Sequence, residues 1–518
     1  MSSIMIKSLI KPVLLTDSIK SNALKTLTFS FKKPLLLVRI GIVCLTTINF
    51  AHANNAASTL PDLGSTAGNI LPPHVANKVG AAFVRQARSR AKFVNDPLLL
   101  DYLNTLGNKL VKVAVPGTAF ENQKFQFHLI EDSSPNAFAV PGGQIFFHTG
   151  LIVDSKSEAE LAGVLAHEIA HITENHSARG IENSKYDNVI AIASILLAAA
   201  SGSAEAAQAA VALSQGGLIQ KRLNFTRGFE READNIAIVT LNKAGYNPSA
   251  LADFLHTFNR RQNFAGSRPP AFLLTHPLTD ERITETESRA RAYPAHKQPN
   301  ENKQTFNDFK AAIIANHHRS PQKLANFYRL NRSALQNSSE RFKYSVALTK
   351  LKKFDEAEKQ LKLALQDSPN NLHYLIAQSE LDIARKNHSA AVKLFERVKQ
   401  ELPEDYEKIE LYHAYTLITA KTNELAIPIL KNAIKRSPKD PDARILIARA
   451  YGELGLLYDS YKARAEHHYL LGNYAFAIKQ LDNAAPLAPN EYEKNNIQTT
   501  KAEYLKEKRQ TEKALKRL

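Results

Sequence analysis

The sequence predicts a mainly α protein, in which an α+β domain with a small sheet beside one helix is followed by an all-α solenoid. Three observations support this fold class. Apolar residues recur at helical spacing between residues 158 and 172. Two runs with strand character, residues 125–130 and 144–148, flank a Pro-Gly-Gly turn. From about residue 339 onward, a pattern of alanine and proline repeats with a period close to 34 residues.

The helix expected near residue 158 has a recognisable start and a clear apolar face. The string Ser155-Lys156-Ser157-Glu158 indicates a capping box that opens it. The residues expected to face the core are Leu161, Leu165, Ile169 and Ile172. Two histidines then project from roughly the opposite side of the helix, toward a cleft.

Those histidines belong to the string His167-Glu168-Ile169-Ala170-His171. Residues four apart share one helix face, so both imidazoles can reach a single metal ion. Glu168 lies beside the open coordination position, where it can take a proton from water, as in metallopeptidases with this spacing. A pair of solvated helix histidines would leave the acid between them unexplained. The string therefore predicts a catalytic site with one Zn²⁺ per chain.

A zinc site of this kind needs a third protein ligand and keeps its fourth position for water or substrate. Glu230 is the best candidate, at the start of a helical segment that ends at Gly245. Asp234 lies one turn further on the same face, where it can accept a hydrogen bond from a ligand histidine; a solvated helix acid is the alternative. Glu232 points elsewhere on a helical wheel and is a weaker ligand candidate.

These motifs resemble the gluzincin family that contains the CAAX prenyl protease and the bacterial heat-shock protease HtpX. Two more strings fit the same family: residues 136–143 with Thr149-Gly150-Leu151, and Thr275-His276-Pro277-Leu278. With an export signal and helical repeats added, the chain most resembles the periplasmic members of that family. The resemblance implies that His167, His171 and Glu230 bind zinc, that Glu168 is the general base and acid, and that Asp234 orients a ligand.

Three roles for His276 remain open. It could donate a hydrogen bond to the developing oxyanion, become a fourth ligand that silences the metal, or pack before a proline turn. Residues 136–143 are expected beside the cleft, where an exposed strand edge could receive an extended substrate by strand addition. His176, five residues after His171, is rotated away from the metal face and is expected to have a structural or surface role.

Residues 1–53 are expected to form an export signal, cleaved near Ala53. Lys32, Lys33 and Arg39 precede an apolar core at 40–50, which is too short for a membrane span. An uncleaved anchor and a later start at Val38 are the alternatives. The single cysteine, Cys44, falls inside that core, so the mature chain has no thiol. This composition suits the periplasm and excludes cysteine-protease chemistry.

The formal net charge of +17 includes seven Lys/Arg and one Asp in the export segment, so its removal leaves +11. A basic exported protein can lean toward an anionic membrane surface or acidic partners. No nucleic-acid module is present in the sequence, and we expect no nucleic-acid partner. Peripheral membrane contact stays open.

Four segments are expected: the signal, a zinc metallopeptidase domain at 54–292, a linker with leading helices at 293–338, and a tetratricopeptide-repeat domain at 339–518. The repeat rests on alanines that each stand twelve residues before a proline: Ala357, Ala391, Ala426 and Ala477. Their steps are 34, 35 and 51, and the long step leaves room for an extra helix near residues 458–471. Such arrays present a concave face to a protein or peptide.

One further segment, residues 189–217, contains an apolar run of about twelve residues and an alanine-rich stretch. A run of that length cannot cross a hydrocarbon layer of about 30 Å. Two short helices that cover the cleft, touch a membrane surface or pack in the core remain alternatives.

The combined expectation is a periplasmic zinc metalloendopeptidase. The resemblance implies stalled or unfolded outer-membrane proteins as substrates and the barrel-assembly machinery as the partner of the repeats. Two alternatives remain. One is a repeat-based chaperone or scaffold with a latent metal site, and the other is a membrane-bound prenyl-type protease, which the missing spans disfavour.

Overall fold

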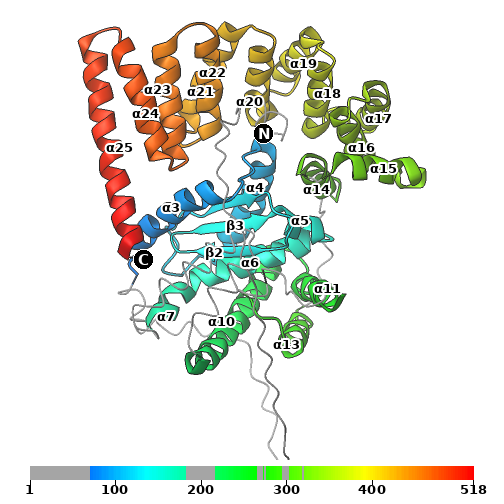
Figure 1. Cartoon of the computed structure of the whole chain (residues 1–518). Helices are drawn as coiled ribbons and strands as arrows, with labels where there is room; N and C mark the ends of the chain where they lie inside the picture. Colours follow the sequence, from blue (N-terminus) through cyan, green and yellow to red (C-terminus); the bar gives the residue numbers. More distant parts are fainter. Residues whose placement is uncertain are drawn as a thin grey trace, which may run out of the picture.

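The structure is a computed structural model that describes residues 71–182, 216–264, 272, 276–293, 303–317 and 320–517. The expected export signal lies outside these residues, as does all but the end of the 189–217 segment. A small sheet lies near the centre of the peptidase domain, and a long helical array arches over it (Figure 1). Within the described residues, no helix combines the length and the hydropathy needed to span a membrane.

The sheet has three strands in the order β1-β3-β2. Strands β1 (Gln126–Ile130) and β3 (Gln144–His148) are parallel, and β2 (Ala137–Val140) pairs antiparallel with β3. The two predicted runs are therefore strands, but they do not form a hairpin with each other. A third strand lies between them in sequence, and the Pro-Gly-Gly turn connects this strand to β3.

Gly142 and Gly143 make that turn possible. Their φ angles are +81° and +75°, a region that is costly for residues with a Cβ. A Cβ on Gly142 would also come within 2.6 Å of the Ala76 carbonyl oxygen in α3 (Pro73–Arg90). The turn thus brings β3 back along β2 while α3 packs closely against it, and β1 and β2 form the two edges of the sheet.

Helix α6 (Glu158–Thr173) is the central helix of the domain and packs against β2. The predicted capping box was two residues too early. Ser157 is the N-cap and accepts from the Glu160 backbone N–H, while the Glu160 carboxylate accepts from the Lys156 N–H. Ser155 instead donates to the Leu151 carbonyl, at the end of the preceding helix. The real box, Ser157 with Glu160, fits the same spacing rule.

The other helices of this domain surround α6 and the sheet. They are α4 (Pro97–Ala114), α5 (Thr149–Asp154), α7 (His176–Glu182), α10 (Gly216–Lys243), α11 (Ala250–Phe264) and α13 (Asp280–Ala290). Because α4, α10 and α11 all pack on α6, this helix is buried on both faces. The sequence had predicted an amphipathic helix with only one buried face. Helix α10 starts well before Glu230, contrary to the sequence expectation. It ends as predicted, with Gly245 at φ +80°.

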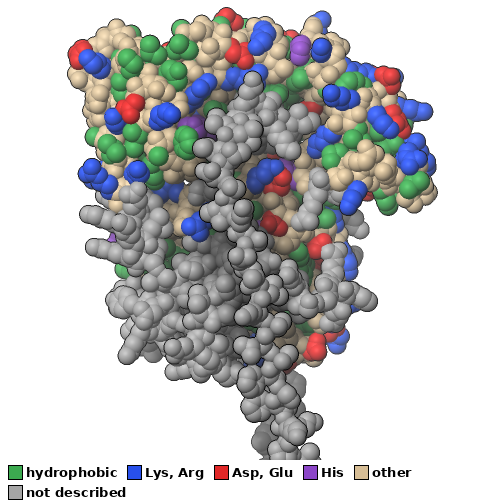
Figure 2. All heavy atoms as spheres, viewed as in Figure 1, with side chains coloured by type: hydrophobic (Ala, Val, Ile, Leu, Met, Phe, Trp, Pro, Cys, Tyr) green, Lys and Arg blue, Asp and Glu red, His purple; other side chains and the backbone are tan. Residues whose placement is uncertain are grey.

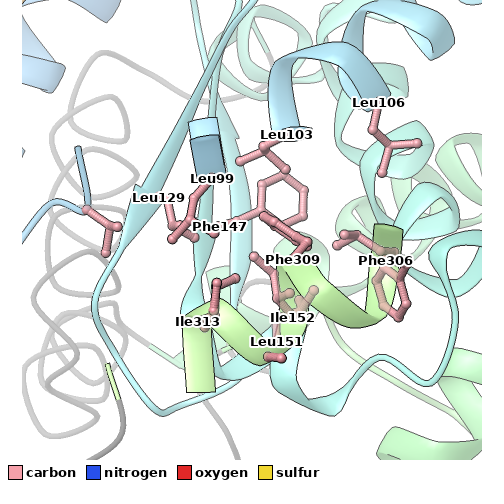
Figure 3. Close-up of a cluster of buried hydrophobic side chains, with 14 of the residues drawn as sticks. Leu99, Leu103, Leu106, Leu129, Phe147, Leu151, Ile152, Phe306, Phe309 and Ile313 are labelled. Atoms are coloured by element: carbon pink, nitrogen blue, oxygen red, sulfur yellow. The ribbon is translucent and has the colours of Figure 1, made fainter. Parts of the chain in front are cut away.

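Helix α14 (Lys303–His317) joins the two parts of the molecule. The sequence placed it among leading helices after a linker, and residues 294–302 of that linker lie outside the described residues. Its Phe306, Phe309 and Ile313 enter the same apolar cluster as side chains from α4, α5, β1 and β3 (Figure 3). The Phe309 ring stacks on Tyr102 of α4 at a centroid distance of 4.1 Å. The peptidase core is therefore completed by a helix from the repeat side.

The array that follows consists of paired helices. In order, they are α15 (Pro321–Leu330), α16 (Ser338–Lys350), α17 (Phe354–Asp367), α18 (Leu372–Ala384), α19 (His388–Glu401), α20 (Pro403–Thr419), α21 (Asn423–Arg436), α22 (Pro441–Glu453), α23 (Leu457–Leu470), α24 (Tyr474–Ala484) and α25 (Glu491–Arg517). Each packs on its neighbours in sequence, as a tetratricopeptide-type solenoid does. The extra helix expected near residues 458–471 is α23.

The long step between Ala426 and Ala477 conceals one regular repeat. Each of the four predicted alanines is fully buried and is the fourth residue of its helix. Ser460 has the same position in α23, 34 residues after Ala426, and is 2 % exposed. Five residues before each of these positions stands a residue with positive φ: Lys352, Lys386, Lys421, Gly455 and Gly472. The 34-residue period therefore continues to Ser460. The next equivalent position, Ala477, follows after only half a period, because α24 packs directly on α23.

The solenoid is anchored on the peptidase domain at points far apart in sequence. The Tyr412 hydroxyl of α20 donates to Asp96, the N-cap of α4, at 2.5 Å. Further along the array, the turn at Gly472 lies against Arg85 of α3, where a Cβ on the glycine would come within 3.0 Å of the arginine Cβ. The inner side of the arch thus faces α3 and α4 (Figure 1). On the face in Figure 2, Lys and Arg are interspersed with Asp and Glu over the repeat helices.

Replacing Phe309 with alanine should destabilise the whole chain by about 3–5 kcal/mol, because it leaves a cavity in the shared core. The measurement is guanidinium unfolding followed by far-UV circular dichroism. The control is Phe327→Ala in α15, whose ring is 50 % exposed. This variant should stay within about 0.5 kcal/mol of the parent. Equal losses for both variants would contradict the shared core.

An ion pair between the sheet end and α14 should make stability pH-dependent. Burial alone would raise the pKa of Glu131, but hydrogen bonds from His317 (2.5 Å) and Lys92 outweigh it and lower the pKa to about 2. The carboxylate therefore stabilises the fold above its ordinary pKa of 4.5, and this contribution is lost as the pH falls toward 2.

Glu131→Gln should accordingly lower the free energy of unfolding by about 1–2 kcal/mol at pH 6. The difference from the parent should shrink steadily between pH 4.5 and 2. Denaturant titrations at a series of pH values test this, with the exposed Glu121→Gln as control. A difference that is constant across this range would show that the carboxylate charge is irrelevant.

Candidate metal centre

Four side chains from three separate segments converge on one point. His167 and His171 come from α6, Glu230 comes from α10, and His276 follows residue 272 in the segment before α13. One ligand-type atom from each lies within 4.8 Å of the others. His167 Nε2 is 3.0 Å from His171 Nε2 and 3.3 Å from Glu230 Oε2. His171 Nε2 lies 3.3 Å from Glu230 Oε1.

The packing of α10 on α6 produces this convergence. Leu165 and Ile169, which alternate with the histidines along α6, are fully buried and hold the helix in the core. Ala233 and Ala237 of α10 are also fully buried. Because these side chains are small, the two helices can approach closely and bring the Glu230 carboxylate to both imidazoles. The structure thus places the three expected zinc ligands together.

Glu168 lies beside the cluster in an unusual environment. Its carboxylate is fully buried, and neither oxygen accepts a hydrogen bond from any described residue. His276 Nε2 is an ionisable neighbour at 3.4 Å from Oε1. A buried carboxylate without donors is costly, so it needs a proton, a water molecule or a cation nearby. This is the environment expected of a general base that faces a metal-activated water.

Asp234 lies one turn after Glu230, and its Oδ1 is 2.9 Å from His167 Nδ1. Arg282 of α13 holds both carboxylates of this helix face. Its Nε and Nη2 donate to Asp234 at 2.6 and 2.9 Å, and its Nη1 lies 2.7 Å from Glu230 Oε2. All three residues are at most 4 % exposed. The carboxylates are therefore fixed in orientation before any metal binds.

The charges at this point favour a cation between the rings. Burial disfavours a charged His167, yet Glu230 and Asp234 outweigh it and raise the pKa of the imidazole to about 10. Burial would likewise raise the pKa of Glu230, but His276 and Arg282 hold it well below its ordinary value. The Glu230 carboxylate therefore stays ionised, and its negative charge stabilises a proton on His167. A divalent cation can take the place of that proton.

His276 lies inside the ligand cluster. Its Nδ1 is 3.1 and 3.2 Å from the two Glu230 oxygens and 3.3 Å from His167 Nε2. Its ring stacks on Phe272 at 4.7 Å, and the residue is 5 % exposed. Its Nδ1 therefore lies among the atoms that could bind a metal, where a fourth ligand would lie.

His176 is not among the clustered ligands, as the helical wheel predicted, but it is buried and contacts the outer nitrogen of His171. Helix α6 ends at Thr173, and Asn175 adopts φ +53°, so His176 starts a new helix with a new direction. Its Nδ1 lies 2.8 Å from His171 Nδ1. This contact with His171 was missed because the wheel assumes an unbroken helix.

Arg282 was also missed. It comes from a helix 48 residues after Asp234, and no spacing rule connects the two. The sequence gives only an indirect hint of this arginine: Glu230 and Asp234 lie on one buried helix face, and two buried carboxylates need a cation nearby. Glu232 was correctly separated from the ligands, since its carboxylate contacts His176 and Arg179 and not the cluster.

The residues present fit a zinc ion. The set combines imidazole nitrogen with carboxylate oxygen, which is the donor chemistry of catalytic zinc sites. The Glu168 carboxylate, buried and without a donor among the described residues, supplies an independent reason for a metal-activated water at this position.

Comparison with known proteins supports a metallopeptidase. Residues 102–290 match the model of peptidase family M48. The mitochondrial metalloendopeptidase OMA1 of Schizosaccharomyces pombe is 32 % identical over 180 residues, 35 % of this chain and 51 % of that protein. The likeness to OMA1 is confined to about a third of the chain.

Two bacterial relatives match over most of their length. The beta-barrel assembly-enhancing protease of Yersinia pestis is 32 % identical over 438 residues, 83 % of this chain and 88 % of that protein. The same-named protein of Escherichia coli strain K12 is 32 % identical over 463 residues, 88 % and 92 % respectively. The match thus includes the solenoid as well as the peptidase domain. This chain belongs to the family of beta-barrel assembly-enhancing proteases, metallopeptidases with an M48 domain.

Proposed function

We propose that the protein is a periplasmic zinc metalloendopeptidase that degrades misassembled or stalled outer-membrane proteins and also assists their assembly. The observation that carries this proposal is the convergence of His167, His171 and Glu230 beside the buried, donor-free Glu168. The names of the relatives support the link to barrel proteins. Export through a signal at residues 1–53 is part of the same proposal.

His167, His171 and Glu230 would hold the zinc ion. When bound, zinc polarises a peptide carbonyl and lowers the pKa of a coordinated water toward about 7. Glu168 takes the proton from the attacking water and returns it to the leaving amine, which is the division of labour for a carboxylate one residue after the first ligand. Its burial keeps competing donors away from the carboxylate.

Asp234 and Arg282 act on the ligands and not on the substrate. The Asp234 carboxylate lies 2.9 Å from His167 Nδ1 and would accept its N–H when Nε2 presents its lone pair to the metal. Arg282 restrains Asp234 and Glu230 together through Nε, Nη1 and Nη2. These contacts keep the site organised at the moment of reaction, when reorganisation would be costly.

Strand β2 supplies a way to bind unfolded substrate. It is one of the two edge strands of the sheet, it packs against α6, and within the described residues it pairs only with β3. An extended polypeptide can add to such an edge through backbone hydrogen bonds, and a folded protein cannot. This selection suits a protease that removes proteins that have not completed folding.

The solenoid is the proposed contact for a protein partner, and the barrel-assembly machinery is the candidate that the relatives' names support. Because α20 and the turn before α24 lie against α4 and α3, a partner bound to the array would sit close to the peptidase domain. The repeats would thereby deliver stalled barrel proteins to the cleft.

A second function is favoured by one specific observation. His276 lies among the ligands, so in this arrangement the fourth position is not free for water. A chain with such a closed site could work mainly as a tetratricopeptide-based chaperone or scaffold with a latent metal site. We assign His276 the role of a reversible fourth ligand, which makes the two functions states of one protein.

Glu168→Gln should abolish cleavage of unfolded casein, with a loss of about 10³-fold or more, because the amide cannot accept the proton. Zinc content, measured by mass spectrometry of the purified chain, should remain one per chain. The control is Glu174→Gln at the C-cap of α6, which lies outside the cluster and should keep parental activity. A Glu168→Gln variant that cleaves casein and supports barrel assembly like the parent would favour the chaperone.

His276→Ala should increase the rate of casein cleavage several-fold in zinc-supplemented buffer, because the fourth position becomes available to water. The initial rate at saturating casein is the measurement. His256→Ala, on the 48 % exposed imidazole of α11, is the matched control and should leave the rate unchanged. A fall of about 10²–10³-fold would instead assign His276 to the oxyanion.

A further inference from the structure

Each of the two zinc-helix histidines has a nitrogen that faces away from the cluster. His167 Nδ1 meets the Asp234 carboxylate directly, at 2.9 Å. His171 Nδ1 meets no carboxylate but the Nδ1 of His176, at 2.8 Å. His176 Nε2 in turn lies 3.1 Å from Glu232 Oε2. The second ligand is therefore connected to a carboxylate through an intervening imidazole.

The proton positions along this chain follow from the role of His171. Its Nε2 faces the other ligand atoms, so a bound metal requires the lone pair there, and the ring hydrogen must be on Nδ1. That N–H can donate only if His176 Nδ1 is an acceptor. His176 then carries its own hydrogen on Nε2, where Glu232 accepts it. Two neutral imidazoles and one carboxylate thus form a single directed series of hydrogen bonds.

The surroundings hold His176 in the orientation that this series needs. Its ring is 5 % exposed and stacks on Phe229 at 4.2 Å with an interplanar angle of 16°. The guanidinium of Arg179 lies over the Phe229 ring, 4.8 Å from its centroid. It also donates a hydrogen bond to the Glu232 carboxylate at 2.9 Å. The carboxylate is therefore fixed by a cation, as Asp234 is fixed by Arg282.

We propose that His176, supported by Glu232, is a positioning residue for the metal ligand His171: it selects the tautomer and the ring orientation in which Nε2 can bind zinc. This inference rests on the proposed function and extends it to residues outside the ligand set. In this proposal, the two histidine ligands are held by different kinds of contact. His167 is held by a buried carboxylate, whereas Glu232 is 34 % exposed at its side chain.

The test measures the zinc dissociation constant of the full chain by competition with a chromophoric chelator, together with the melting temperature of the metal-free protein. His176→Phe preserves the stacked ring but removes both nitrogens. It should weaken zinc binding by about 10–100-fold. His176→Asn places an amide oxygen where Nδ1 stood, and it should restore most of that loss. Glu232→Ala should weaken binding several-fold.

Two controls match these variants. His413→Phe removes a buried histidine of the solenoid that also stacks on a phenylalanine, Phe395, and it should leave zinc affinity unchanged. Glu281→Ala removes a surface carboxylate paired with Arg231, and it too should have no effect. A purely structural role for His176 would lower the melting temperature of both the Phe and the Asn variant and would give no selective rescue.

Zinc affinity of His176→Phe within twofold of the parent would overturn the proposal. Failure of His176→Asn to bind more tightly than His176→Phe would do the same. If His176→Phe has a lowered melting temperature, Glu232→Ala becomes the decisive variant, because its partly exposed side chain is not part of the core. Unchanged zinc affinity of Glu232→Ala would reject the proposal, and weakened zinc affinity would support it. A parent chain that binds no zinc would reject the proposed function itself, which is a different result.

Discussion

The close packing of α10 on α6 is the constraint on which the site depends. Glu230 is 59 residues from His171 in the sequence, and only this helix pair brings its carboxylate within 3.3 Å of both imidazoles. The fully buried Ala233 and Ala237 make the approach possible. A site assembled from two packed helices is rigid, which a metal site needs because ligand geometry must be set before the ion arrives.

The same rigidity extends outward through charged side chains. Asp234 and Arg282 fix one histidine and the ligand carboxylate, and His176 with Glu232 contacts the other histidine. At a larger scale, α14 contributes Phe309 to the core that supports β3 and α4, and Tyr412 links the solenoid to α4. The peptidase domain and the repeats are therefore joined by a shared apolar cluster and by a buried hydrogen bond.

Much of this was predictable from sequence because the relevant rules are local. The two histidines, strands β1 and β3, and the tetratricopeptide period all depend on spacing within about 35 residues. Ser460 was missed because serine replaced the expected alanine, although Gly455 five residues earlier marks the same turn. Arg282 and the contact of His176 with His171 could not be predicted, since they depend on how separate helices are oriented in space.

The most direct test of the account is the zinc K-edge absorption spectrum of the purified full chain. The account predicts one zinc per chain with only nitrogen and oxygen neighbours near about 2.0–2.1 Å, and an imidazole signal that falls when His171 is replaced by alanine. A carboxylate contribution should vanish in Glu230→Ala. A chain that carries no zinc, or a spectrum that Glu230→Ala leaves unchanged, would contradict the three-ligand centre.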